Sequence, residues 1–273
     1  MKDLLISIVL YKTNINDLTR CINSIRKFKP EQKIIFIDNS PDKNLKKYLE
    51  NYEFIDYYHN KKNLGYGAGH NIAIRKSIKN GYKYHLVINA DIYFESDVLN
   101  EMISYMNANE NIGNMMPKIM NVDGSIQRLC KLIPNPLDLI KRIIFKNPMR
   151  FEKYYEFSLK CFKYDKVAFI PYLSGCFMML RISKIKKIGL FDERFFMYPE
   201  DLDLSRRIAL RFDSVFYPMC KVFHKHNADS KKNFKLFLIH AINMIIYFNK
   251  WGWFIDRDRD IINQKTVNLL KKN

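Results

Sequence analysis

Two polar residues separated by one alanine follow an apolar stretch of the chain, and their types and spacing suit a metal ion. The stretch is His85–Ile88, and Asn89-Ala90-Asp91 comes directly after it. If the chain stays extended there, the side chains of Asn89 and Asp91 point to the same side. Amide and carboxylate oxygens so placed can bind a hard divalent cation while a diphosphate supplies further ligands. The competing interpretation is a plain turn that ends a strand, which three residues alone favour.

Paired acids further along the chain suit proton transfer. The stretch 191–204 places carboxylates between large apolar residues, with Glu200 and Asp201 at the expected start of a helix. The helix dipole favours acids there, so helix capping explains one of them. Two adjacent carboxylates sheltered by aromatic residues are better suited to a general base beside a bound substrate.

Three more motifs could contact a nucleotide or a metal. Asp38-Asn39-Ser40 ends an apolar stretch, where a carboxylate often reads a base or a ribose hydroxyl, although an Asx turn is an equally good account. The stretch 65–69, Gly-Tyr-Gly-Ala-Gly, could offer exposed N–H groups to phosphate. It matches neither the dinucleotide fingerprint nor the Walker loop. His224 could be a metal ligand, but a lone histidine is more often a core or surface residue.

The elements that must position these motifs alternate between strand and helix in the first third of the chain. The expected strands are 4–11, 33–37, 54–58 and 85–88. We expect a first helix that runs to Phe28, a short one around 45–49, and a third that follows the loop 60–69 and runs through Ile72, Ile74 and Ile78. Asn14 or Asn16 would cap the first helix and Pro30 would end it. This alternation predicts an α/β fold with a parallel sheet whose ligand lies beyond the carboxyl ends of the strands.

The second half of the chain is less regular. We expect a hairpin turn at Asp123-Gly124, an apolar segment 168–180 that contains Gly175, and a helix that begins near Glu200. Residues 134–166 form a basic, aromatic insertion without a predicted shape. The tail 234–254 is predicted to be an amphipathic helix that either packs on the core or, preceded by Lys231-Lys232, lies on an anionic membrane. Core packing is the slightly favoured of the two.

Composition limits the class of protein. The chain has 273 residues, 48% of them hydrophobic, and 46 basic against 28 acidic residues give a net charge of +18. That charge favours anionic partners: nucleic acid, acidic lipid or phosphorylated small molecules. No apolar stretch reaches the roughly 20 residues that span a bilayer, and the N-terminus is predicted to be a strand rather than a signal peptide. We expect a cytoplasmic protein with at most peripheral membrane contact.

The cysteines indicate a reducing compartment. Five are spread widely along the chain, without a Cys-x-x-Cys pair or a Cys/His cluster. We therefore expect buried free thiols. They are Cys21, Cys130, Cys161, Cys176 and Cys220.

Taken in order, the motifs resemble those of bacterial family 2 glycosyltransferases with a GT-A fold, in their rhamnosyltransferase-like branch. The resemblance extends from Leu4 to about His224 and gains its specificity from the order of the motifs. These are the opening strand into Tyr11, the turn at 38–40, the stretch 63–71 (NLGYGAGHN), Asn89-Ala90-Asp91, the stretch 174–179 (SGCFMM), the stretch 191–204 and His224.

The resemblance implies a Rossmann-like, mostly parallel central sheet flanked by helices, with a C-terminal helical tail. It divides the chain into a GT-A domain, 1–225, and a helical, membrane-associating candidate segment, 226–273. Within the domain, 1–120 would bind the nucleotide-sugar and 121–225 would supply the acceptor and catalytic half.

The resemblance also implies roles for single residues. Asp201 would be the catalytic base, with Glu200 beside it, and Asp91 and His224 would hold Mg²⁺ or Mn²⁺. Asn89 gives this metal site one charge fewer than a two-aspartate version. The acceptor or sugar pocket would contain Gly175, Cys176 and Glu200. The nucleotide-sugar site would contain Tyr11, Asp38, Asn39, Ser40, Asn63, Gly65, Gly67, Asn71, Asn89, Ala90 and Asp91.

The implied reaction is an inverting sugar transfer from a nucleotide-diphosphate donor to a hydroxyl of a glycan or polyprenyl-diphosphate-linked acceptor, in bacterial O-antigen or capsule synthesis. The first expectation for the donor is dTDP-L-rhamnose, and a UDP-hexose is the alternative. A single inverting displacement needs one base, whereas glycoside hydrolysis would need two flanking carboxylates.

Two other classes compete with the transferase. A nucleotidyltransferase or sugar-nucleotide hydrolase would share the metal and nucleotide sites. A non-enzymatic binder of nucleic acid or anionic lipid rests on charge alone. Because the chain carries no recognisable nucleic-acid-binding motif, we expect no nucleic-acid partner.

Overall fold

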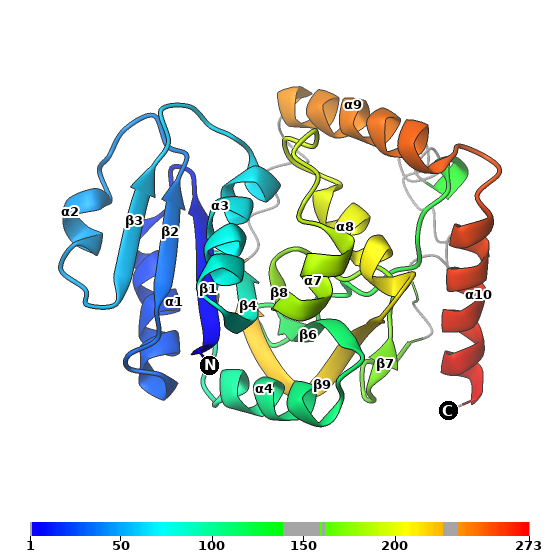
Figure 1. Ribbon diagram of the computed structural model, residues 1–273, viewed down its shortest axis with the longest axis horizontal. Coiled ribbons are helices and arrows are strands. Elements are labelled where there is room, and N and C mark those ends of the chain that lie inside the picture. Colours follow the sequence, from blue (N-terminus) through cyan, green and yellow to red (C-terminus); the bar gives the residue numbers. More distant parts are fainter. Residues whose placement is uncertain (1, 139–158, 160–161, 226–233, 273) are drawn as a thin grey trace.

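A central sheet organises the protein, as the computed structural model in Figure 1 shows. The structure describes residues 2–138, 159, 162–225 and 234–272. Within them the sheet has nine strands, eight of them in the order β3-β2-β1-β4-β8-β6-β9-β5, and β7 pairs with β9. Their bounds are β1 Lys2–Leu10, β2 Ile34–Asp38, β3 Ile55–His59, β4 Tyr82–Ile88, β5 Ile92–Tyr93, β6 Ile112–Met120, β7 Ala168–Phe169, β8 Phe177–Arg181 and β9 Asp213–His224.

The first half of the sheet is parallel, as predicted. Strands β3, β2, β1 and β4 all run the same way. The second half is mixed, because β8 runs antiparallel to both of its neighbours, β4 and β6, while β6 and β9 are parallel. The reversed direction of β8 brings its beginning to the edge where β4 ends, with Phe177 paired to Ile88.

Helices cover both faces of the sheet because buried side chains alternate along the strands. Residues such as Ile88 and Met179 pack with α1 and α4 on one face. Val87 and Met178 pack with α3, α7 and α8 on the other. The bounds are α1 Ile15–Phe28, α2 Lys46–Leu49, α3 Tyr66–Lys79, α4 Val98–Ala108, α7 Ile182–Ile188 and α8 Glu200–Ala209.

Local sequence signals explain where several elements begin and end. Of the two predicted caps, Asn14 is the one that accepts from the N–H groups of Asn16 and Asp17, and α1 ends two residues before Pro30. The predicted turn at Asp123-Gly124 is confirmed: Gly124 has a φ of +83°, and Asn121 N donates to Ser125 O. Helix α8 begins at Glu200, as expected.

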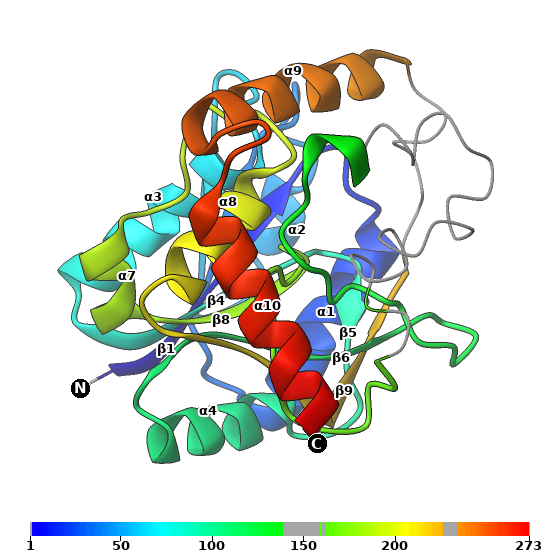
Figure 2. The same cartoon turned by 90° about the vertical axis from the view of Figure 1, so that its right-hand side faces the viewer.

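The tail forms two helices, α9 Phe234–Trp251 and α10 Arg257–Lys272. The first confirms the predicted helix, but it ends at Trp251 because the chain turns at Gly252, whose φ is +101°. Figure 2 shows α9 across one end of the molecule and α10 running back past the sheet. The inner side of α9 packs Met244, Tyr247 and Phe248 on the start of α8. No described helix is long and apolar enough to cross a membrane.

Some expectations concern parts of the chain outside the description. Most of the insertion 134–166 lies there, as do Lys231-Lys232, His226 and Cys161. Within the described part of the insertion, Phe162 and Tyr164 pack into the main core. The other four cysteines are buried free thiols, as predicted.

Candidate active site

The ends of β1 and β2 bring the first polar motif to one edge of the sheet. Asn39 N donates to the carbonyl of Leu10, and the Ser40 hydroxyl accepts from Lys12 N at 2.8 Å. The Asp38 carboxylate is buried, and it accepts from Ser40 N at 2.9 Å and from the Tyr57 hydroxyl at 2.6 Å. The Asx turn considered above is therefore present. Each carboxylate oxygen still has a second lone-pair direction.

A hollow of about 190 Å³ lies beside this turn. A larger hollow of about 520 Å³ lies at the other end of β2, lined by residues 28–32 and Asn100, and contains none of the predicted site residues. We regard the smaller hollow as the relevant one because four of the predicted site residues, from three separate loops, line it. Its lining residues are Tyr11, Asn39, Ser40, Pro41, Lys61, Lys62 and Asn63.

The glycine-rich stretch is buried, and it contacts both the turn at 38–40 and the loop before α8. Asn39 Nδ2 donates to Gly65 O at 3.1 Å. Gly65 has a φ of +88°, and a Cβ there would lie 2.1 Å from Phe196 O. The N–H groups of Gly65 and Tyr66 donate to Asn63 Oδ1 and Phe196 O. The expectation of exposed N–H groups facing phosphate is wrong for these two, because the glycines serve close packing.

Gly67 and Asn71 also face the loop before α8. A Cβ on Gly67 would lie 2.9 Å from Phe191 Cβ. Asn71 is fully buried and pairs with both backbone groups of Phe191, at 2.9 and 3.0 Å. The geometry gives Asn71 a structural task, which is to fix the segment that leads to Glu200.

The second polar motif, after β4, forms a turn rather than an extended segment, since Ile92 N donates to Asn89 O. Asn89 and Asp91 nevertheless both lie close to one atom, His224 Nε2. His224 Nε2 lies 3.3 Å from Asp91 Oδ1 and 3.5 Å from Asn89 Nδ2. The pairing of β5 with the end of β9 brings His224 there, opposite Ile92.

Gln127, which sequence reasoning missed, fixes the His224 ring. Its Nε2 donates to His224 O at 2.8 Å and to Asn121 Oδ1 at 2.7 Å, so its Oε1 is the atom that accepts from His224 Nδ1 at 3.0 Å. In the neutral imidazole the proton is therefore on Nδ1, and the Nε2 lone pair lies toward Asp91. Metal-binding histidines are typically oriented in this way. The turn at 123–124 was the available sequence signal, because it returns the chain beside β9.

The paired acids open α8 and face the loop before β8. Asp201 Oδ2 accepts from Gly175 N at 2.9 Å, and its Oδ1 accepts from Leu202 N at 2.8 Å. Gly175 is required there, because a Cβ would lie 3.0 Å from Asp201 Cβ. Burial raises the pKa of Asp201, and the two N–H donors oppose that rise.

Glu200 is the more deeply buried acid of the pair. Burial, and then the charge of Asp201, raise its pKa to about 8. Its Oε2 atom is buried and has no hydrogen-bond partner among the described residues. Glu200 therefore holds a proton more readily than an ordinary glutamate, while the two N–H donors favour the ionised form of Asp201.

Tyr66 links the two polar clusters and was also missed. Its hydroxyl lies 2.9 Å from Asn89 Oδ1 and 2.7 Å from Gly175 O. The backbone of the same loop reinforces the link, since Asn89 N donates to Cys176 O at 2.9 Å. The turn at 89–91 and the loop that holds Asp201 are thus hydrogen-bonded to each other.

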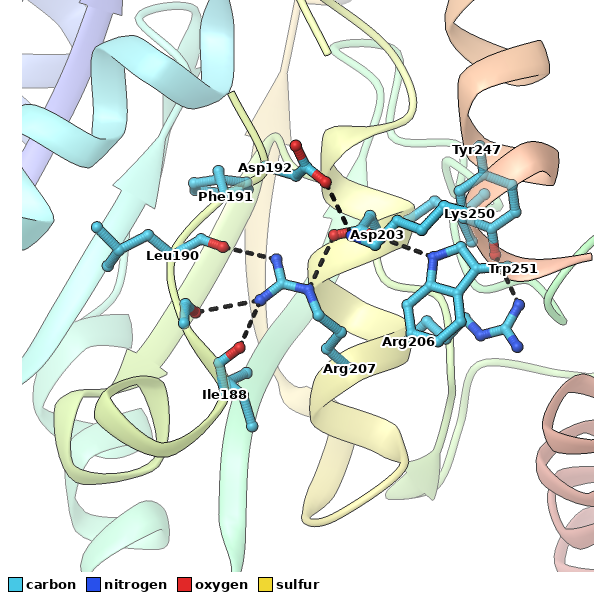
Figure 3. A network of polar contacts seen from close by, with 12 residues as sticks. Ile188, Leu190, Phe191, Asp192, Asp203, Arg206, Arg207, Tyr247, Lys250 and Trp251 are labelled. Carbon is cyan, nitrogen blue, oxygen red and sulfur yellow. Dashed lines mark hydrogen bonds and ion pairs between the residues drawn. The ribbon is translucent and has the colours of Figure 1, made fainter. Parts of the chain in front are cut away.

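The other acids of the stretch 191–204 hold α8 in place (Figure 3). Asp203 is fully buried and accepts from Arg207 Nε and Trp251 Nε1, each at 2.8 Å. Lys250 lies 2.6 Å from Asp203 and 2.8 Å from Asp192. Hydrogen bonds from Arg194, then from Lys250, hold the pKa of Asp192 well below its usual range. These acids are structural.

A buried ion pair completes the attachment of α9 to α8. The Arg206 guanidinium lies 2.5 Å from Asp256 and 4.0 Å from the centre of the Trp251 ring. Figure 3 shows this side chain beside Tyr247, whose hydroxyl is 3.3 Å from Arg206 Nη1.

The described residues contain no group of three or more His, Cys, Asp or Glu side chains that could hold a metal unaided. A cation here would be shared between Asp91, His224 and a ligand. The donor set fits that use: one carboxylate, one oriented imidazole lone pair, and open coordination positions for phosphate oxygens, as Mg²⁺ and Mn²⁺ sites in nucleotide enzymes provide.

Residues 6–189 match the family described as Glycosyl transferase family 2. The matched range includes the strands and loops of the site as far as the segment before α8. The chain belongs to glycosyl transferase family 2. The family 2 expectation from the motifs is thereby confirmed.

Among the relatives, rhamnosyltransferases recur. The chain is 26% identical over 246 residues to Rhamnosyltransferase WbbL of Escherichia coli K12, covering 85% of this chain and 87% of that protein. It is 42% identical over 62 residues to the N-acetylglucosaminyl-diphospho-decaprenol L-rhamnosyltransferase of Mycobacterium tuberculosis, covering 22% of this chain and 20% of that one. The rhamnosyltransferase-like branch is supported by both.

Solved structures confirm the GT-A fold. GalNAc-T7 with UDP, GalNAc and Mn²⁺ aligns with a TM-score of 0.62 at 16% identity, over 81% of this chain and 43% of that chain. Staphylococcus aureus TarS 1–349 with UDP-GlcNAc aligns with a TM-score of 0.61 at 14% identity, over 97% and 72%. The family 2 chain therefore spans less than half the length of GalNAc-T7.

Proposed function

We propose that this family 2 member is an inverting transferase that moves a sugar from a nucleoside-diphosphate donor to an acceptor hydroxyl, with Asp201 as the base. The observation that carries this proposal is the hydrogen-bonded junction between the turn at Asn89–Asp91 and the loop that holds Asp201. It brings the proposed cation ligands close to the proposed base. A single displacement at the anomeric carbon needs both of these and no enzyme nucleophile.

In this mechanism Asp201 accepts the proton of the acceptor hydroxyl as that oxygen attacks the anomeric carbon. The bond from the anomeric carbon to the donor diphosphate breaks, and the diphosphate leaves with the electron pair. Gly175 N and Leu202 N hold the carboxylate oriented for this transfer. Glu200 stays protonated beside it and can donate a hydrogen bond to a sugar oxygen.

The proposed metal residues are Asp91 and His224, with Mg²⁺ or Mn²⁺ as the ion. When bound, the ion would offset the negative charge that develops on the departing diphosphate. The neutral Asn89 leaves the cluster with one carboxylate, so we expect the ion to bind weakly until a nucleotide adds its phosphates. Mn²⁺ in the GalNAc-T7 structure is consistent with this choice.

For the donor, we propose dTDP-L-rhamnose first and a UDP-hexose second. The names of the relatives favour rhamnose, whereas UDP and UDP-GlcNAc occupy the similar solved structures. The hollow beside Tyr11 and Ser40 is the proposed place for the base and ribose, and Lys61 and Lys62 at its rim suit an anionic ligand.

For the acceptor, we propose a glycan or a polyprenyl-diphosphate-linked sugar in surface polysaccharide synthesis. The decaprenol-linked substrate in the name of the mycobacterial relative supports the lipid-linked form. The outer side of α9 supports it too. Leu238, Ile242 and Ile245 are exposed there at helical spacing, and residues 236–249 contain no charged side chain. We propose that this side contacts the membrane surface.

The first test is a melting-temperature panel of UDP, dTDP and their sugars, each with and without Mn²⁺. A ligand that binds only the folded chain raises the melting temperature by mass action. We expect a shift that needs Mn²⁺ and is larger for one of the two bases. A full panel without any shift would contradict the proposal and return the basic-surface binder to first place.

A further inference from the structure

The Tyr66 hydroxyl has more acceptors than protons. It lies 2.9 Å from Asn89 Oδ1 and 2.7 Å from Gly175 O. A phenol carries one proton to donate. One proton cannot serve two acceptors with good geometry.

The partners differ in what they can do. A backbone carbonyl can only accept, so the phenol proton belongs to Gly175 O, which is also the nearer atom. The two ends of an Asn amide have nearly the same shape, and their assignment follows from the hydrogen-bond network. With its NH₂ turned toward Tyr66, Asn89 donates to the phenol oxygen while the phenol donates to Gly175 O.

The same choice decides what faces His224. In the neutral imidazole the proton is on Nδ1, where Gln127 Oε1 accepts it, so His224 Nε2 presents a lone pair to a bound cation. The Asn89 amide atom on that side lies 3.5 Å from Nε2, and Asp91 Oδ1 lies 3.3 Å from it. Once Asn89 is turned, that amide atom is its oxygen. Three electron-rich atoms then converge, an arrangement that a cation stabilises.

We propose that Tyr66 is a positioning residue for the cation site: by donating to Gly175 O it obliges Asn89 to point its amide oxygen at Asp91 and His224, which makes Asn89 the third protein ligand. The inference rests on the proposed function, since that function supplies the cation. Tyr66 itself need not touch the ion or the substrate.

The experiment measures the Mn²⁺ dissociation constant by calorimetry or electron paramagnetic resonance, with UDP and with dTDP present. Tyr66→Phe keeps the ring and removes the proton that sets the amide, so Mn²⁺ affinity should fall by about tenfold. Tyr48→Phe is the matched control. It removes a hydroxyl that also has two partners, Thr19 and Tyr52, at 2.6 and 2.5 Å, and should leave Mn²⁺ affinity unchanged.

A second background tests whether Tyr66 acts through the amide. Asn89→Asp presents an oxygen to the ion whichever way it turns. In that background Tyr66→Phe should therefore have no further effect on Mn²⁺ affinity, a non-additive result. An equal loss in both backgrounds, or no loss in either, overturns the inference. If the unaltered protein binds no Mn²⁺ with either nucleotide, the proposed function fails with it.

Discussion

At the scale of single residues, Glu200 and Asp201 differ in environment although they are neighbours in sequence. Asp201 receives two backbone N–H donors, whereas one oxygen of Glu200 has no partner among the described residues. Sequence alone identified both acids as candidates, because paired carboxylates at a helix start are conspicuous. The family resemblance named Asp201 as the base, but the sequence could not show how the two environments differ, because that depends on the Gly175 loop, which approaches from 26 residues away.

Replacing the proposed base tests its role. Asp201→Asn keeps an oxygen for Gly175 N and removes the ability to accept a proton. We expect transfer to fall by about 10²–10⁴-fold while the nucleotide-induced shift in melting temperature persists. The measurement is product formation with whichever donor the nucleotide panel selects. Asp258→Asn, an exposed acid on α10, is the control, and equal rates for the two variants would contradict the assignment.

Glu200 predicts a pH dependence of stability. Its pKa rises from 4.5 to about 8 on folding, so the folded chain binds this proton more tightly than the unfolded chain. The free energy of unfolding therefore loses a contribution as pH rises from about 4.5 to about 8. Glu200→Gln lacks this loss. Its melting temperature relative to the unaltered protein should increase across that window, and parallel curves would rule the idea out.

At the scale of elements, the segments with regular hydrophobic patterns, caps or prolines were predictable from the sequence. The features that depend on contacts between residues far apart in the chain were not. The Asn14 cap, Pro30 and the apolar runs locate α1, β1 and β2 from local signals alone. The direction of β8 depends on pairing with β4, nearly a hundred residues upstream, which no local pattern encodes. Gly65 was noticed as a flexible residue, but its reason, contact with Phe196, is tertiary.

Loss of the buried ion pair that attaches α9 to α8 should destabilise the fold more than loss of an exposed ion pair. Asp256→Asn leaves the Arg206 charge buried without its partner, which should lower the free energy of unfolding by about 3–5 kcal/mol. The exposed pair Lys46–Glu50 gives the contrast, because Glu50→Gln should change the free energy of unfolding by less than about 1 kcal/mol. Denaturant titration measures both. Similar small effects would mean that the buried pair Arg206–Asp256 does not stabilise the fold.

At the scale of the whole molecule, several exposed apolar side chains lie on α9 and the turn that follows it. The turn between α9 and α10 exposes Phe254 by 72% and Ile255 by 93%, next to the uncharged outer side of α9. With the net charge of +18, this region suits an anionic membrane surface. The sequence predicted a helix here with two alternative uses: core packing of its inner side is confirmed, and membrane contact of its outer side stays a prediction.

Vesicle flotation tests the membrane proposal. We expect the protein to bind vesicles that contain anionic lipid, and Phe254→Ser with Ile255→Ser to weaken that binding by about tenfold, because burial of two large apolar side chains is lost. Met219→Ser, which removes a side chain exposed by 59% on β9, should not. Equal binding by all three proteins would place the contact elsewhere.

The reversed direction of β8 has a consequence for exchanging parts between relatives. Because its first residues pair with the last residues of β4, the loop 174–176 and the turn 89–91 share one ladder of backbone bonds. A chimaera joined near residue 120 would take these two segments from different parents, although the join itself falls between strands. Grafts meant to change the acceptor should therefore carry both segments as a unit, with Tyr66 between them.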